Sequence, residues 1–411
     1  MNKLIFTTVR GRRAAVLASE KRILQFEFEG EEAVSQIGTI YVGKVRNVVK
    51  NLNAAFVEYK PGVNGYYSLN DNRVHTFADG TRSDRALKSG DEIVVQVSRA
   101  AVKTKDAVLS GDLTLTGRYV AVMTRDTNQT SLGISAKITD KKWREHFKEQ
   151  WKTCLDAGQS ETPPLPASLR CYHYIIRTNA YGVSFEDVLS EAVKLSSHLE
   201  YICKNAAFRM AYSVLHTPES FAVSKVRDFR MEQNAEIVTD DKTIYDELKN
   251  SGLLAFSPSK SAIGLRFYED SYPLASLYNL EASLDRALGK NVWLKSGGYL
   301  VIEPTEAMTV IDVNTGKNIE KKSPEEIYFK TNLEAAAEIA FQLRLRNLSG
   351  IIIVDFIDMK EEEHNAELLN VFRQHLNQDP VKTTLVDMTA LGLVEVTRKK
   401  LKQPLHEQIN R

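Results

Sequence analysis

Apolar and polar positions alternate in short runs through the first part of the chain. Alternation over four to eight residues is typical of strands that bury one face. Near the N-terminus it predicts three strands, at 3–8, 13–18 and 23–28. Three short strands cannot close a core of their own, so we expect them to pack against a later segment of the chain.

A second set of alternating runs is separated by Gly, Pro and Asn residues, which favour turns. These runs predict five strands, at 39–45, 54–59, 64–69, 92–98 and 107–109. So many short strands within so short a segment favour a small antiparallel barrel over residues 36–116. The polar segment 70–88 is expected to be a loop between the third and fourth of these strands.

The middle of the chain mixes the two periodicities. Helical spacing predicts helices at 141–157, 186–214 and 243–250, and apolar runs predict strands at 118–123, 172–177, 236–239 and 264–268. Segment 156–167 contains three prolines among small polar residues, which is typical of a linker.

The last block begins with three predicted strands, at 292–294, 299–303 and 309–314. A helix follows with a clear start, because Ser323 is a good N-cap, Pro324 suits the first helical position and Glu326 can complete a capping box. We expect this helix to continue to about Asn347 and to be ended by Gly350.

The run 351–356 is apolar except for Asp355, and such a run predicts a strand that is buried on both faces. A helix at 361–377 and a strand at 383–388 are expected after it. Alternating strands and helices predict an α/β layer with a largely parallel sheet.

Composition excludes several classes of protein. The chain has 411 residues with 43 % hydrophobic and 26 % charged residues, which is typical of a globular protein with about two to four domains. No apolar run is long enough to span a membrane or to form a signal peptide, so we expect a soluble, cytoplasmic protein. The net charge of +1 neither requires nor excludes a nucleic-acid partner. The three cysteines, Cys154, Cys171 and Cys203, are expected to be buried free thiols.

The sharpest candidate site lies in the last block. Asp312 and Asn314 point to the same face of a predicted strand, since side chains alternate along a strand. Asp355 interrupts the apolar run 351–356, where an uncompensated carboxylate would be costly. Two carboxylates and an amide oxygen suit Mg²⁺, which could assist phosphodiester chemistry. Alternatively, these Asp residues cap helices, or Asp355 pairs with an arginine of the preceding helix.

The barrel segment combines cationic and aromatic residues, including Lys44, Lys105, Phe56 and Tyr66. Aromatic side chains on a small barrel can stack on single-stranded bases while cations follow the phosphates. The alternative is that Phe56 belongs to the barrel core and that the tyrosines are half-buried strand residues. The spacing of the residues leaves both interpretations open.

Several motifs of this chain resemble the bacterial ribonuclease E/G family. Segments 311–316, 332–336 and 342–359 match its motifs in order and spacing, and segments 41–45, 53–59 and 65–67 resemble its embedded S1-type RNA-binding barrel. The resemblance extends over nearly the whole chain and is weakest at 125–165 and 220–290.

The resemblance implies a multidomain fold that mixes α+β and α/β parts. An RNase H-like subdomain would comprise 1–35 and 222–290, with an S1-type OB barrel at 36–116 and a 5′-sensor at 117–221 inserted into it. A DNase I-like catalytic subdomain would follow at 291–411.

The resemblance also implies an activity, namely endonucleolytic cleavage of single-stranded RNA in mRNA decay and rRNA processing, leaving 5′-phosphate and 3′-hydroxyl ends. By the family pattern Asp312 and Asp355 would hold Mg²⁺, or Mn²⁺ in its place, and Asn314 would help to position the scissile phosphate. The remaining implied positions bind RNA through Phe56, Tyr66, Lys105 and Lys44, and a 5′-monophosphate through Arg177, Thr178 and Gly117.

The sequence departs from the family pattern at its end. The zinc-link motif, Cys-Pro-x-Cys, does not occur before the last residue, Arg411. Either the chain is a short form of the family, without that motif and without the small C-terminal domain, or the sequence is part of a longer chain. In this sequence we expect no zinc, and the zinc-bridged homo-oligomer of the family stays open. Ala390 stands where members of the family carry a basic residue, and segment 132–137 is less basic than its counterpart.

Two other functions remain open from the sequence. The first is a catalytically weak or inactive RNA-binding protein of the same family, although such a protein would not need Asp312, Asn314 and Asp355 together. The second is a phosphatase or nuclease acting on DNA, because an aromatic barrel surface does not by itself distinguish ribose from deoxyribose.

Overall fold

The computed structural model describes residues 2–30, 36–101, 105–124, 131–157, 172–229, 235–254, 264–316 and 323–409. The chain divides into two compact units. Unit 1 comprises residues 1–29, 231–250 and 263–411, and unit 2 comprises residues 30–230 and 251–262. Among the described helices, none has the length and apolar character needed to cross a bilayer.

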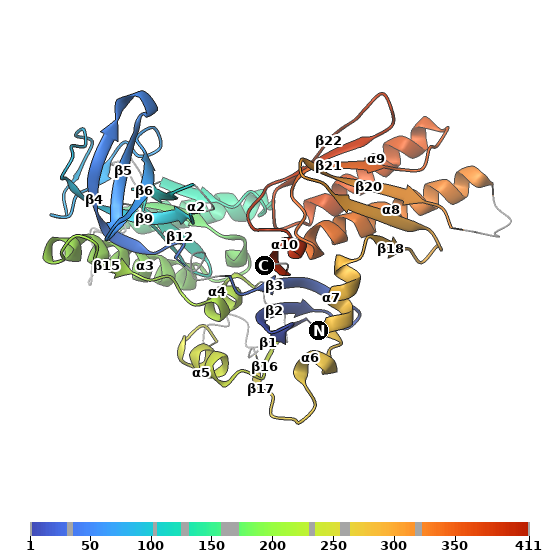
Figure 1. The fold of residues 1–411 in the computed structure, drawn as a ribbon, viewed down its shortest axis with the longest axis horizontal. Coiled ribbons are helices and arrows are strands. Elements are labelled where there is room, and N and C mark those ends of the chain that lie inside the picture. The colour runs from blue at the N-terminus through green and yellow to red at the C-terminus, as the bar shows by residue number, and fades with distance from the viewer. Residues whose placement is uncertain are drawn as a thin grey trace. The chain divides into compact units, whose positions relative to one another are not determined.

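The first sheet of unit 1 has five strands in the order β17-β16-β1-β2-β3 (Figure 1). The N-terminal strands β1 (Lys3–Val9), β2 (Arg12–Ala18) and β3 (Ile23–Phe28) form an antiparallel meander. The later strands β16 (Glu236–Thr239) and β17 (Gly264–Phe267) extend it in parallel with β1. The three N-terminal strands thus complete their sheet with a segment from much later in the chain.

Three helices follow the strands of this sheet along the chain, α5 (Lys242–Asn250), α6 (Leu274–Leu277) and α7 (Leu280–Leu288). Leu274, Leu280 and Leu284 are fully buried and pack with Ile5 and Val16 of the sheet in one apolar cluster. Burial of each such side chain contributes about 1.5–3 kcal/mol to folding.

The second sheet of unit 1 has six strands in the order β18-β19-β20-β21-β23-β22. These strands are β18 (Asn291–Trp293), β19 (Tyr299–Pro304), β20 (Met308–Asn314), β21 (Gly350–Asp355), β22 (Thr383–Met388) and β23 (Val394–Arg398). Among the described strands of this sheet, only β20 and β21 pair in parallel, so the prediction of a largely parallel sheet is wrong. Short turns join β18 to β19, β19 to β20 and β22 to β23, and they permit only antiparallel pairing, whereas a whole helix connects β20 to β21. Strands β21 and β23 are not consecutive in the chain, and they also pair antiparallel.

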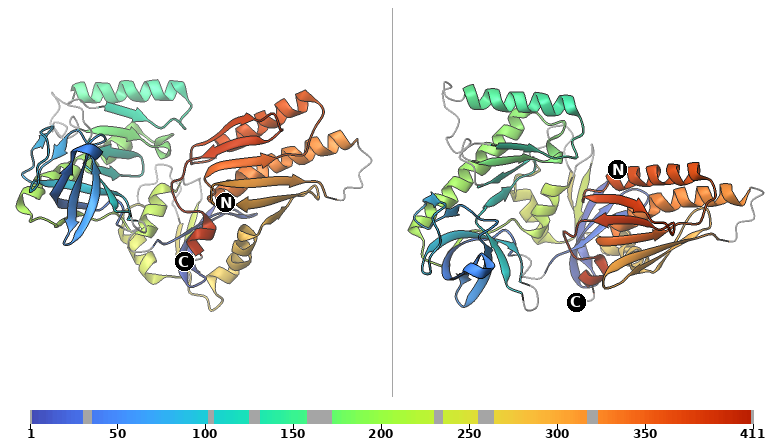
Figure 2. Two further views of the ribbon diagram at one scale, coloured as in Figure 1. Left: turned by 45° about the horizontal axis from the view of Figure 1, so that its top comes forward. Right: turned by 90° about the horizontal axis from the view of Figure 1, so that it is seen from above.

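Two long helices, α8 (Pro324–Leu345) and α9 (Glu362–Asn377), lie side by side against one face of this sheet (Figure 2). Ile352 and Val354 of β21 are fully buried beneath them, whereas Ile351 on the other face is 50 % exposed. The prediction that β21 is buried on both faces is therefore wrong. An apolar run does not reveal that both covering helices lie on the same side.

Helix α8 begins as expected, because the Ser323 side chain accepts a hydrogen bond from the backbone N–H of Glu326 at 3.3 Å. It ends earlier than expected, at Leu345. Asn347 takes a left-handed conformation (φ 50°), and the N–H of Leu348 donates to the carbonyl of Leu343 at 3.0 Å. Asn also tolerates this conformation, so Asn347 ends the helix and Gly350 opens β21 instead. A short last helix, α10 (Leu405–Ile409), follows β23.

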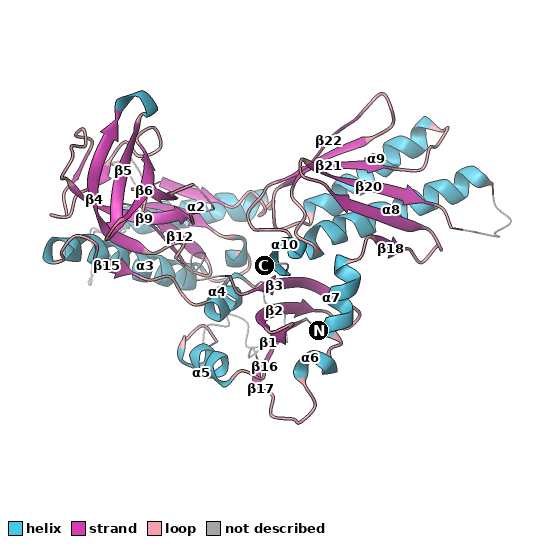
Figure 3. Cartoon of the chain, viewed as in Figure 1, coloured by secondary structure: helices cyan, strands magenta, loops and turns pink. Residues whose placement is uncertain are grey.

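The barrel of unit 2 closes through five strands (Figure 3). They are β4 (Ile40–Val49), β5 (Ala54–Lys60), β6 (Val63–Ser68), β9 (Glu92–Arg99) and β10 (Ala107–Ser110). Pairing of β4 with β9 closes the ring, and β6 pairs in parallel with β10, so the barrel is OB-like but not wholly antiparallel. The expected loop 70–88 contains a small hairpin of β7 (His75–Thr76) and β8 (Arg82–Ser83).

A four-stranded sheet completes unit 2 in the order β11-β12-β14-β13. Its strands are β11 (Thr114–Thr116), β12 (Val120–Met123), β13 (Ser131–Ile134) and β14 (His173–Ile176), and its helices are α2 (Lys141–Ala157), α3 (Phe185–Asn205) and α4 (Phe221–Asp228). Single helical turns lie at η1 (Lys50–Leu52), η3 (Thr178–Ala180) and η4 (Ala206–Phe208).

Helix α3 ends at Asn205, so its predicted extension to residue 214 is wrong. The apolar residues that suggested the extension do not face the core, since Phe208 and Met210 are each 84 % exposed. Instead β15 (Val214–His216) joins the barrel sheet beside β4. Most of the predicted linker 156–167 lies outside the described residues.

The cysteines are less buried than expected. Cys154 and Cys203 have intermediate exposure and are not joined in a disulfide, and Cys171 lies outside the described residues. Burial of the thiol raises the pKa of Cys203 to about 11, which keeps it in the unreactive protonated form at neutral pH.

Candidate active site

The two candidate carboxylates lie next to each other at the ends of neighbouring strands. Strands β20 and β21 run parallel, and their register pairs Asp312 with Asp355. Residues paired in this way project to the same face, and neighbouring strands are about 4.8 Å apart. Two acidic side chains that are 43 positions apart in the sequence therefore meet on the open face of the sheet.

Asn314 belongs to the same group. Its Nδ2 donates to Oδ2 of Asp312 at 2.7 Å, which orients that carboxylate. Among the described residues no hydrogen bond to its Oδ1 is observed, so this oxygen could serve as a ligand for a cation. The set thus offers two carboxylates and one amide oxygen, which fits a hard cation such as Mg²⁺ or Mn²⁺.

Asp355 is exposed at the strand end, which corrects the expectation that it lies in a buried run. Partial desolvation of its carboxyl group raises its pKa, and the charges of Asp312 and Asp358 raise that pKa further. The like charges of these carboxylates repel one another, and a bound divalent cation would relieve that repulsion. Asp358 therefore contributes to the electrostatics of the site, a role that the sequence analysis missed.

A second residue that the sequence analysis missed is Asn332 of α8. It is completely buried, and its amide bonds the backbone of Ile357, between Asp355 and Asp358. An amide on the apolar face of a helix was the available signal, because a buried polar group needs partners.

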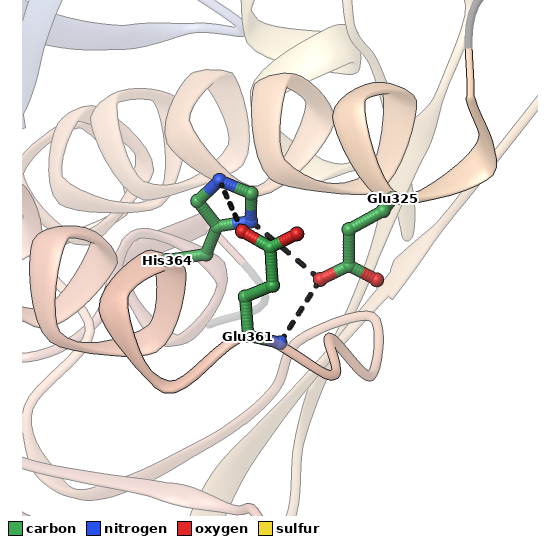
Figure 4. Close-up of side chains that lie close together, drawn as sticks. All are labelled: Glu325, Glu361 and His364. Atoms are coloured by element: carbon green, nitrogen blue, oxygen red, sulfur yellow. Dashed lines mark hydrogen bonds and ion pairs between the residues drawn. The ribbon is translucent and has the colours of Figure 1, made fainter.

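A cluster of Glu325, Glu361 and His364 lies near the start of α9 (Figure 4). Among the described residues, it is the group of three His, Cys, Asp or Glu side chains whose ligand atoms lie within 4.8 Å of one another. The two ring nitrogens of His364 face different carboxylates, Nδ1 facing Glu325 at 3.5 Å and Nε2 facing Glu361 at 3.3 Å. Phe329 stacks on the imidazole with the ring centroids 4.2 Å apart.

This geometry favours a structural connection between α8 and α9 over a metal site. One ring nitrogen can hold an ion, but here both nitrogens are directed at separate carboxylates. In addition, the Glu325 oxygen that faces the ring already accepts the backbone N–H groups of Lys360 and Glu361, at 3.0 and 3.2 Å.

The predicted RNA-binding residues of the barrel lie on its outer surface. Phe56 and Tyr66 pair across β5 and β6, are partly exposed, and contact each other edge to face with centroids 6.2 Å apart. Tyr67 and Tyr59 are buried instead, so Phe56 is a surface residue and not part of the barrel core. Lys44 on β4 is partly exposed, and Lys105 is exposed just before β10.

The predicted phosphate-binding residues of unit 2 also lie together. The guanidinium of Arg177 donates through Nη1 to the carbonyl of Gly117 and through Nη2 to Asp228 at 2.8 Å. The hydroxyls of Thr178 and Ser135 are 3.0 Å apart. The N–H of Gly117 donates to Val120, so Gly117 orients Arg177 through its carbonyl and has no free backbone donor for an anion.

Asp228 is the acidic partner that the sequence analysis missed. Partial burial acts to raise its pKa, but the guanidinium groups of Arg227 and Arg177 outweigh that effect and hold the pKa below its usual value. Asp228 therefore stays ionised at neutral pH and keeps Arg177 in place.

Sequence similarity to known proteins identifies the family of this chain. Residues 114–401 match the sequence model of the family described as the Ribonuclease E/G family. The chain is 32 % identical over 388 residues to Ribonuclease G of Salmonella typhimurium, covering 92 % of this chain and 76 % of that protein. It is 33 % identical over 379 residues to Ribonuclease G of Haemophilus influenzae, covering 90 % and 73 %. It is also 32 % identical over 376 residues to Ribonuclease E of a Nostoc species, covering 90 % and 52 %.

Proposed function

The chain belongs to the ribonuclease E/G family and is an endoribonuclease, and from this premise we propose that it cleaves single-stranded RNA at Asp312, Asn314 and Asp355 with the help of Mg²⁺. The products would carry 5′-phosphate and 3′-hydroxyl ends, and the substrates would be mRNA and rRNA precursors in the cytoplasm. The observation that carries the proposal is the pairing of Asp312 with Asp355 across two parallel strands.

The chain's own residues have separate tasks in this proposal. Asp312 and Asp355 would hold the cation, and when bound it would activate water and stabilise charge on the scissile phosphate. Asn314 orients Asp312 through its Nδ2 and would direct its Oδ1 towards the bound group. The outer surface of the barrel, with Phe56 and Tyr66, would supply affinity for RNA by stacking on bases.

The fold supports the same assignment. We propose that the five-stranded sheet of unit 1 is the RNase H-like part and that the six-stranded sheet with α8 and α9 is the DNase I-like catalytic part. The closed five-stranded barrel fits the S1-type domain of the family.

Removal of divalent cations is the first test of the proposed chemistry. We expect cleavage of a labelled single-stranded RNA oligonucleotide to stop in EDTA and to return with Mg²⁺ or Mn²⁺, because the donor set consists of oxygens. Mapping of the product ends should give 5′-phosphate and 3′-hydroxyl groups. Cleavage that continues in EDTA would contradict the metal-dependent mechanism, and binding without cleavage in any metal would favour the non-catalytic alternative.

The 5′-sensor gives a second prediction. If Arg177 binds a 5′-monophosphate, Arg177→Ala should reduce the preference for 5′-monophosphorylated over 5′-hydroxyl RNA by about tenfold or more, since a charge-assisted contact is lost. Cleavage rates of the two substrates under identical conditions measure this ratio. Lys204→Ala is the matched control, because this exposed lysine forms an ion pair with Glu200 on the surface of α3. An unchanged ratio in Arg177→Ala would place the sensor elsewhere.

A further inference from the structure

Asn332 is the one fully buried amide side chain on the described part of α8 (relative exposure 0 %). It lies among apolar residues, with Ala335 and Ala336 buried one turn further along the helix. A buried amide without partners would cost free energy on folding, so the contacts of this side chain explain its presence.

Both polar groups of the Asn332 side chain bond one residue, Ile357. Its Nδ2 donates to the carbonyl of Ile357 at 2.8 Å, and its Oδ1 accepts the N–H of Ile357 at 3.1 Å. The amide therefore acts as a neighbouring strand would, just after β21 has ended at Asp355. Ile357 directly precedes Asp358 and lies two residues after Asp355, so the bonded residue belongs to the short segment between the two carboxylates.

The same helix anchors this segment a second time. Glu325, in the first turn of α8, accepts the backbone N–H of Glu361 (Figure 4) and that of Lys360 through one carboxylate oxygen. Segment 356–361 is thus bonded to α8 at both of its ends, and Asp358 lies between the two anchors.

We propose that Asn332 is a positioning residue that holds Asp355 in register with Asp312 for binding of the divalent cation. The inference rests on the proposed function and adds to it the residue that preserves the geometry of the two carboxylates.

The physical reason lies in the repulsion within the site. Asp312 and Asp355 are paired across β20 and β21, and Asp358 follows three residues later, so the carboxylates repel one another when no cation is bound. Asp355 is the last residue of β21, so strand pairing does not continue into segment 356–361 and does not oppose movement there. The two hydrogen bonds from a buried helix side chain oppose it instead.

Side chains that are similar to Asn in size or chemistry cannot make the same two hydrogen bonds at position 332. Asp would direct an oxygen at the carbonyl of Ile357, Leu would leave both backbone groups of Ile357 without partners, and Gln is one methylene longer in a packed interior. Asn332→Ala removes both bonds and adds no new group, so it is the most direct test.

The experiment measures binding of Mn²⁺ to the full chain by electron paramagnetic resonance, and separately the Mg²⁺ dependence of cleavage. Loss of a residue that orients a metal ligand typically weakens metal affinity by about 10–100-fold. We expect Asn332→Ala to raise the Mn²⁺ dissociation constant and the half-saturating Mg²⁺ concentration within that range, while saturating Mg²⁺ restores most of kcat.

Gln342→Ala is the matched control. Gln342 is also a nearly buried amide on α8, but its partners are Glu338 and Arg346, away from segment 356–361. The Gln342→Ala substitution should lower the free energy of unfolding without changing the affinity for Mn²⁺. If Asn332→Ala changes Mn²⁺ affinity no more than Gln342→Ala does, Asn332 has only a structural role and the inference is wrong.

If Asn332→Ala does not fold, Glu325→Ala decides the question, since Glu325 is less central to the core. A raised Mn²⁺ dissociation constant in Glu325→Ala supports anchoring by α8, and parental affinity contradicts it. Failure of the proposed function itself appears differently, as parental Mn²⁺ affinity in Asp312→Asn and Asp355→Asn.

Discussion

Replacement of Asp312 or Asp355 by Asn should lower the rate of RNA cleavage by on the order of 10³-fold or more, while the affinity for RNA changes little. Each substitution removes the negative charge that would hold the cation and keeps the size of the side chain. Because these residues are paired across β20 and β21, neither carboxylate can replace the other. RNA affinity is expected to come mainly from the barrel, which these substitutions leave intact.

Single-turnover cleavage of a 5′-monophosphorylated oligonucleotide, together with a filter-binding measurement of RNA affinity, tests this prediction. Asp387→Asn is the matched control, since Asp387 is an exposed residue on β22 of the same sheet. This variant should cleave RNA at the parental rate. Parental cleavage by the Asp312→Asn/Asp355→Asn double variant would show that the reaction takes place elsewhere.

Replacement of Asp379 by Ala should lower the free energy of unfolding by about 3–5 kcal/mol, because it leaves the charge of Arg398 buried and uncompensated. The two side chains are almost completely buried, with 1 % and 3 % exposure, and they approach to 2.8 Å. Nη1 of Arg398 also donates to Oδ1 of Asn347 and to the carbonyl of Leu348, so this guanidinium connects the end of α8 to β23.

Urea unfolding followed by circular dichroism measures the effect. In the Asp379→Leu/Arg398→Met double variant no charge is left unpaired, and we expect much of the lost stability to return. Asp246→Ala is the surface control, because its pair with Lys242 is exposed and should contribute less than about 1 kcal/mol. If Asp379→Ala costs no more than Asp246→Ala, the buried pair does not stabilise unit 1 as proposed.

Local patterns correctly predicted most elements of the chain. The start of α8 at Ser323 follows from side-chain capping, which depends on residues within one turn. The alternation that places Asp312 and Asn314 on one face likewise needs no knowledge of the rest of the fold, and the structure joins those two side chains by a hydrogen bond.

The errors occurred where distant segments decide the outcome. Strand direction in the six-stranded sheet depends on which strands become neighbours, and the exposure of Ile351 depends on which side α8 and α9 cover. The early end of α3 follows because the chain beyond it pairs with β4 of the barrel. Such competing contacts are not encoded in the periodicity of one segment.

The candidate site shows the same division. The sequence by itself determined the chemistry, namely two carboxylates and an amide at strand ends within recognisable motifs. Only the tertiary structure decided that Asp312 and Asp355 share a register, and that Asn332 bonds Ile357, two residues after Asp355. Side-chain type and alternation are properties of the local chain. Strand register and the hydrogen bonds from Asn332 to Ile357 arise only when segments far apart in sequence fold against one another.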